Sequence, residues 1–136
     1  MSPAKPATSS SRHHDDRGSV SVELVILLPA LFAVMFLGMQ AALYYHARTV
    51  AIAAAQEGAR TAGGEHSRAA DGAAAASAFV ADAGGDDALL AASATAARTA
   101  TTATVTVRGF ALSVIPGWRP EIKQSATVPL ERLTTP

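Results

Sequence analysis

The sequence contains no cysteine, few aromatic residues and no excess of charge of either sign. Because there is no Cys among the 136 residues, disulfides and thiolate metal sites are excluded. Aromatic residues make up only 5% of a chain that is 49% hydrophobic, since alanine supplies most of the apolar count, so we expect a thin core. The 11 basic and 11 acidic residues cancel, and the excess positive charge of a nucleic-acid-binding protein is missing.

Motifs of catalytic chemistry are missing as well. Gly63-Gly64 and Gly84-Gly85 lack the Lys-Ser/Thr or Rossmann continuation that a phosphate-binding loop needs. His46 and His66 have no nucleophile motif to serve, so no hydrolase triad is predicted. The His-His-Asp-Asp run at residues 13–16 has metal-ligand types, but adjacent residues do not close a rigid tetrahedral site by themselves. We therefore expect neither an enzyme nor a protein that holds a metal or other cofactor.

One long apolar run dominates what is present. Residues 24–45 contain no Asp, Glu, Lys or Arg over 22 positions, and only Pro29 and Gln40 interrupt the apolar sequence. At about 1.5 Å per residue, a helix of this length crosses the ~30 Å hydrocarbon layer of a bilayer. The run also lacks the polar face of a soluble helix. It predicts a transmembrane helix, with Tyr44 and Tyr45 as aromatic anchors at the far membrane interface.

A carboxylate, Glu23, directly precedes this run and requires an explanation. If the chain were cut after Gly18, Ser19 would carry a free α-ammonium group and Glu23 would be the fifth residue of the new chain. In a low-dielectric setting the two charges attract, and pairing offsets the cost of burying either one. The alternative is a Glu near a helix N-terminus, where the helix dipole favours negative charge.

These residues also carry a family resemblance. A polar leader, a Gly, four residues, a Glu and an apolar helix resemble the prepilin processing signal of type IV pilins and pseudopilins. The longer pattern R-G-S-V-S-V-E-L-V-I-L-L-P, followed by Y-Y-H-A-R and A-A-A-Q-E-G-A-R-T-A, is similar to TadE-like proteins of tight-adherence (Flp-type) pilus assembly. The likeness covers residues 17–62. Ser19 stands where major pilins commonly carry Phe, which favours a minor component over a filament-building subunit.

The resemblance implies a minor pseudopilin-like protein of the bacterial cytoplasmic membrane, cut between Gly18 and Ser19 by a prepilin peptidase. Its implied partners are that peptidase, membrane lipid, and other pilus-assembly membrane proteins or pilins that contact the N-terminal helix. In pilins the ammonium that pairs with the residue matching Glu23 belongs to the neighbouring subunit. Lys5, Arg12 and Arg17 before the span predict a cytoplasmic N-terminus and an extracytoplasmic C-terminal module.

Two alternatives remain open at this point. One is an unprocessed, signal-anchored envelope protein with a small outer binding module. The other is an ordinary secreted protein cleaved after the run, although the run exceeds the about 7–15 apolar residues of a typical signal peptide. The position of the mature N-terminus distinguishes all three.

The rest of the chain predicts an α+β protein in three parts. Residues 1–18 form a disordered leader, residues 19–62 a long helix that ends at Gly63-Gly64, and residues 63–136 a small module. That module has a helix over about 67–83 and a β-hairpin, whose strands at about 102–108 and 121–130 flank the Pro116-Gly117 turn.

We expect the apolar face of the hairpin to pack on the second helix or on the last third of the first helix, since an isolated hairpin is marginal. Small residues in that last third either form a packing surface for another helix or simply reflect the abundance of alanine. They are Ala51, Ala54, Ala55 and Ala59.

Overall fold

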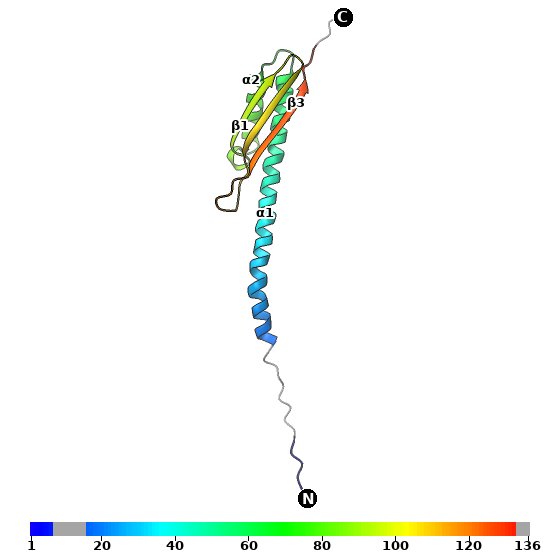
Figure 1. Cartoon of the computed structure of the whole chain (residues 1–136), viewed down its shortest axis with the longest axis vertical. Helices are drawn as coiled ribbons and strands as arrows, with labels where there is room; N and C mark the ends of the chain where they lie inside the picture. Colours follow the sequence, from blue (N-terminus) through cyan, green and yellow to red (C-terminus); the bar gives the residue numbers. More distant parts are fainter. Residues whose placement is uncertain (7–15, 133–136) are drawn as a thin grey trace. The chain divides into compact units, whose positions relative to one another are not determined.

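The computed structural model describes residues 1–6 and 16–132, and the chain divides into two units, Met1–Met35 and Phe36–Pro136. Half of the leader that was predicted to be disordered, residues 7–15, lies outside the described residues. The elements follow in the order α1 (Asp16–Gly63), α2 (Ala69–Asp82), a 3-10 helix η1 (Gly85–Asp87), β1 (Leu90–Arg98), β2 (Thr102–Phe110) and β3 (Glu121–Pro129) (Figure 1). The predicted α+β class, with a long N-terminal helix and a shorter second helix, is confirmed.

Helix α1 begins at Asp16, three residues before the predicted start, and continues through Pro29. It ends at Gly63, at the predicted pair of glycines, because glycine has the lowest helix propensity after proline. The amide of Gly64 still bonds the carbonyl oxygen of Thr61 at 3.4 Å, which tightens the last turn. The chain then turns back toward α2.

Helix α2 has clear start and stop signals. The Asp71 carboxylate accepts a hydrogen bond from the backbone N–H of Arg68 at 2.7 Å, as in the second half of a capping box. Gly84 and Gly85, with φ of 124° and 58°, then take backbone conformations that L-residues rarely adopt, and the helix ends at Asp82 as predicted. Its buried face consists of Gly72, Ala76 and Val80.

The sheet is antiparallel with strand order β1-β2-β3. Strand β2 alternates as predicted, with Ala103, Val105 and Val107 buried and the intervening threonines half-buried. On the other face, Thr104 bonds Thr127 at 2.8 Å, and Thr106 makes a 2.7 Å bond to Ser125 of β3. Strands β2 and β3 are the predicted hairpin, but the sheet contains one strand more than that hairpin, namely β1.

Strand β1 was not expected, because the sequence predicted only the two strands of the hairpin in this module. It pairs with β2 throughout, apart from an irregularity between Leu90 and Ser93. Within that bulge Ala91 has a φ of 48°, and its N–H donates to the Asp86 carboxylate at 3.2 Å. The added strand makes the sheet more stable than an isolated hairpin.

The core of the second unit lies between the sheet, α2 and the last part of α1, which stand side by side in Figure 1. The sheet packs on both helices, so both predicted packing partners are used. A Cβ on Gly58 of α1 would lie 2.6 Å from the carbonyl oxygen of Gly72 in α2 and 2.9 Å from Cγ1 of Val105 in β2. Helix α1 contributes small side chains to this core, namely Ala47, Val50, Ala51, Ala54, Ala55, Ala59 and Ala62.

This packing decides the question that the small residues of α1 left open. Ala51, Ala54 and Ala59 are 0% exposed and Ala55 is 1% exposed. They contact this chain's own α2 and sheet, so this face is not free for another protein's helix.

Candidate functional site

The predicted cleavage site lies in the first turn of α1. Gly18 is exposed, and no atom lies within 4 Å of the position that a Cβ would take there. The predicted scissile bond, Gly18–Ser19, belongs to a turn whose N–H groups have no intrahelical partners, and such turns fray readily. The segment is therefore open to an enzyme once the first turn unwinds.

Glu23 lies four residues beyond Ser19, so the two positions share one face of α1. Its side chain is exposed and flanked by Val22 and Leu24, which are also exposed. Among the side chains that the structure describes, Glu23 has no ion-pair partner. A carboxylate thus stands at the N-terminal border of an exposed apolar surface.

That surface extends along α1 from Val20 to Met39. Every large hydrophobic side chain in this stretch is at least 48% exposed. Within residues 1–6 and 16–132, α1 is the one helix long and apolar enough to cross a membrane, with a mean hydropathy of 2.5 in its most apolar window. An exposed apolar surface of this size is typical of a segment that contacts a membrane or another protein.

The environment of α1 changes at Gln40. This side chain is 4% exposed and is the one buried polar residue in the described part of the chain. Its Oε1 accepts hydrogen bonds from the Val114 N–H at 2.9 Å and from the Ser113 hydroxyl at 3.0 Å, while its Nε2 donates to the Leu112 carbonyl at 3.3 Å. Gln40 therefore ties the β2–β3 loop to α1.

The tip of this loop is the predicted Pro116-Gly117 turn. The Trp118 N–H donates to the Ile115 carbonyl at 3.3 Å, and Gly117 has a φ of 77°, as a type II turn with Pro second and Gly third requires. The turn brings Ile115 and Trp118 together, and both remain exposed, at 39% and 49%.

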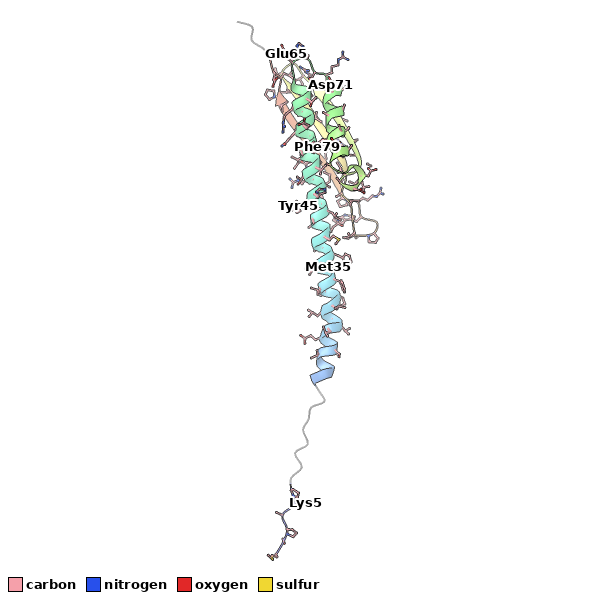
Figure 2. The ribbon with its side chains drawn as sticks, turned by 180° about the vertical axis from the view of Figure 1, so that it is seen from behind. Lys5, Met35, Tyr45, Glu65, Asp71 and Phe79 are labelled. Carbon is pink, nitrogen blue, oxygen red and sulfur yellow. The ribbon has the colours of Figure 1, made fainter. Side chains whose placement is uncertain are left out.

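These two side chains close one side of an apolar groove of about 460 Å³. The other side is α1, which contributes Leu37, Gln40, Ala41, Tyr44 and Tyr45. The predicted anchors are neighbours here: their rings meet edge to face with centroids 5.9 Å apart. Tyr44 is half-buried against the core, and Tyr45, labelled on α1 in Figure 2, is 61% exposed.

Sequence reasoning thus singled out Tyr44 and Tyr45, as membrane-interface anchors. It missed the hydrogen bonds by which Gln40 holds the β2–β3 loop, and it missed the loop tip with Ile115 and Trp118. Two signals were present in the sequence. Gln40 is the one hydrogen-bonding side chain of the apolar run before its tyrosines, and Trp118, beside the predicted turn, is the chain's single tryptophan. What neither signal carried was that these positions, 78 residues apart, line one groove.

No group of three or more His, Cys, Asp or Glu side chains within the described residues is arranged to hold a metal ion. The side chains of the His-His-Asp-Asp run at 13–16 lie outside the described residues.

Comparison with known proteins gives one match. Residues 18–60 match the family model of TadE-like proteins. The match confirms the resemblance stated from the sequence; it begins at Gly18 and includes Glu23, the apolar stretch and Gln40. It implies a role in tight-adherence pilus assembly for a protein with one candidate membrane-spanning helix. Searches of curated proteins and of solved structures found no significant match.

Proposed function

We propose that this chain is a single-pass, minor pseudopilin-like protein of a tight-adherence pilus assembly machine, matured by cleavage after Gly18. The observation that carries the proposal is the family match at residues 18–60, which coincides with the exposed apolar stretch of α1 and starts at the cleavage residue. Lys5, Arg12 and Arg17 on the N-terminal side of the span support a cytoplasmic N-terminus, where a prepilin peptidase meets the leader.

Glycine at position 18 serves cleavage in two ways. It lacks a Cβ, so its backbone fits a narrow cleft in an extended conformation. It also weakens the first turn of α1, since glycine costs about 1 kcal/mol relative to alanine in a helix. The open space around Gly18 leaves the bond accessible to the peptidase.

Glu23 then acts through charge. Cleavage converts the Ser19 amide into an ammonium group near an exposed apolar surface, where a lone charge is unfavourable. The Glu23 carboxylate pairs with such an ammonium, either within the same helix at i, i+4 or from an adjacent subunit. The pairing with an adjacent subunit sets the register between subunits as they leave the bilayer.

The test of cleavage is the mature N-terminus. The full chain is co-expressed with an active prepilin peptidase and analysed by intact mass spectrometry. The wild type is expected to lose residues 1–18, while Gly18→Val retains Met1. Gly38→Val is the matched control, because Gly38 lies in the same helix with no atom within 4 Å of an added Cβ, and it should be processed normally.

A wild type that keeps Met1 while the peptidase cleaves a known prepilin would overturn the proposal. The unprocessed, signal-anchored envelope protein would then stand.

The role of Glu23 is tested by Glu23→Ala. Cleavage and membrane insertion are expected to persist, while the amount of sheared pili falls sharply because the ammonium has lost its partner. Glu65→Ala, at an exposed position after α1, is the control and should assemble pili normally. Normal pilus assembly by Glu23→Ala would contradict the pairing with the ammonium. It would favour the alternative, in which Glu23 lies near the helix N-terminus because the helix dipole favours negative charge there.

A further inference from the structure

We propose that the β2–β3 loop, residues 111–120, is a second membrane contact, and that phospholipid acyl chains fill the groove between its tip and α1. The inference rests on the membrane span in the proposed function, but on neither cleavage nor pilus assembly. Its starting point is a position: Ile115 and Trp118 line one groove with Leu37 and Tyr45, which belong to the last part of the predicted span. A loop that contacts these residues lies where the span leaves the hydrocarbon.

The hydrogen bonding of the loop suits that location. Irregular backbone is tolerated at the edge of a bilayer only where its polar groups are paired. Gln40 pairs Leu112 and Val114, as described, and the Ile115 N–H donates to the Ser113 hydroxyl at 3.1 Å. The base of the loop is closed by the Ala111 N–H, which donates to the Pro120 carbonyl at 2.9 Å.

The side chains at the tip suit the same location. Tryptophan and tyrosine prefer the interface between hydrocarbon and water, where the ring is buried and its polar atom reaches a headgroup or water. Trp118 and Tyr45 present two such rings from different elements, and Ile115 adds an aliphatic side chain to the same groove. Arg119 follows at an exposed position, from which a guanidinium can reach toward the phosphate level.

An acyl chain is the occupant that fits because the groove continues an exposed apolar surface. The groove is lined almost wholly by apolar atoms. The exposed Phe36, four residues before Gln40, lies on the same face of α1 and extends the apolar surface toward the span. Lipid that surrounds residues 24–39 has no barrier against entering a groove that begins at Leu37. The contact is therefore apolar and does not require anionic lipid.

The single tryptophan makes the proposal directly measurable, because all tryptophan emission comes from Trp118. The full chain is reconstituted in phosphatidylcholine vesicles, with lipids brominated either near the glycerol backbone or near the terminal methyl group. Emission from Trp118 is expected to shift to shorter wavelength than that of tryptophan in water. Shallow bromines should cause a larger loss of emission than deep bromines, aqueous iodide a small loss, and added salt no change.

Two relocated tryptophans, each combined with Trp118→Phe, separate the possible failures. Leu28→Trp reports on the span and should be quenched by brominated lipid and not by iodide. Thr101→Trp, at the exposed turn between β1 and β2, should be quenched by iodide alone. Quenching at position 28 but not at Trp118 overturns the loop contact and leaves the proposed function intact. Absence of quenching at both positions overturns the span itself.

Removal of the Gln40 side chain, which holds the β2–β3 loop on α1, gives an independent test of the loop contact. Gln40→Ala should raise iodide quenching of Trp118 and lower quenching by shallow bromines, whereas Gln56→Ala, at an exposed position on the same helix, should change neither. Unchanged quenching in Gln40→Ala would contradict the tether. Protection of Trp118 from iodide in detergent micelles that contain a pilin helix, but not in vesicles, would assign the groove to a protein partner instead.

Discussion

Two stretches of helix α1 differ in which side chains they expose and which they bury. In residues 20–39 of α1 the large residues Leu, Val, Phe, Ile and Met are exposed, whereas in residues 40–63 small alanines are buried. A water-soluble protein does the reverse, because large apolar side chains gain most from burial. The first stretch therefore presents large apolar side chains to its surroundings, and the second permits close approach of this chain's own α2 and β2.

The difference lies in side-chain size rather than in helix propensity. Both stretches are helical, and both are poor in charge. Gly58 and Gly72 let α1 and α2 approach until a single added carbon would meet backbone, as small residues do at membrane helix interfaces. The small residues of the second stretch thus permit a neighbouring helix of the same chain at short distance.

The largest expected effect comes from equal truncations in and out of the packed region. Leu89→Ala removes a side chain that is 0% exposed and should lower the free energy of unfolding by about 2–5 kcal/mol. Leu28→Ala, at a residue that is 51% exposed, should leave the unfolding of the sheet unchanged. Denaturant unfolding of the full chain in detergent micelles, followed by the circular dichroism of the sheet, measures both. Equal losses of unfolding free energy would contradict the assignment of Leu89 to the core and of Leu28 to an exposed surface.

A second comparison uses the glycines of α1. Gly58→Ala forces backbone or Val105 to move and should destabilise the second unit by about 1–3 kcal/mol. Gly38→Ala meets no atom within 4 Å and should be neutral or stabilising by up to about 1 kcal/mol. The same unfolding measurement applies, and a tolerated Gly58→Ala would disprove the tight helix contact.

The smallest expected effect concerns Gln40, which lies where the exposed stretch of α1 meets the buried one. Gln40→Ala leaves the Val114 N–H without its acceptor and should cost about 1–2 kcal/mol, confined to the loop. Hydrogen exchange of the Val114 amide should accelerate, while Gln56→Ala should leave it unchanged. Slow exchange in Gln40→Ala would show that the loop is held by other contacts.

The elements with strong local signals were predictable. Glycine pairs end both helices where expected. Strand β2 alternates Thr with Val or Ala, and in β3 Lys123, Ser125 and Thr127 alternate with a face that includes Ile122, Ala126 and Val128, as half-buried strands require. Strand β1 was not predictable because its sequence, L-A-A-S-A-T-A-A-R, presents alanine on both faces and so carries no periodic contrast. Pairing with β2 makes it a strand, since the partner supplies the hydrogen bonds.

By itself the sequence determined the long apolar run, the spacing from Gly18 to Glu23 and the helix stop signals, because each depends on residues within one turn or one uninterrupted run. Tertiary structure alone decided that the alanine face of α1 is covered by the same chain, and that Gln40 holds a loop whose tip carries the single tryptophan. The reason is physical: alanine and glutamine are compatible with either solvent exposure or burial, and only the neighbours that folding brings to them select between the two.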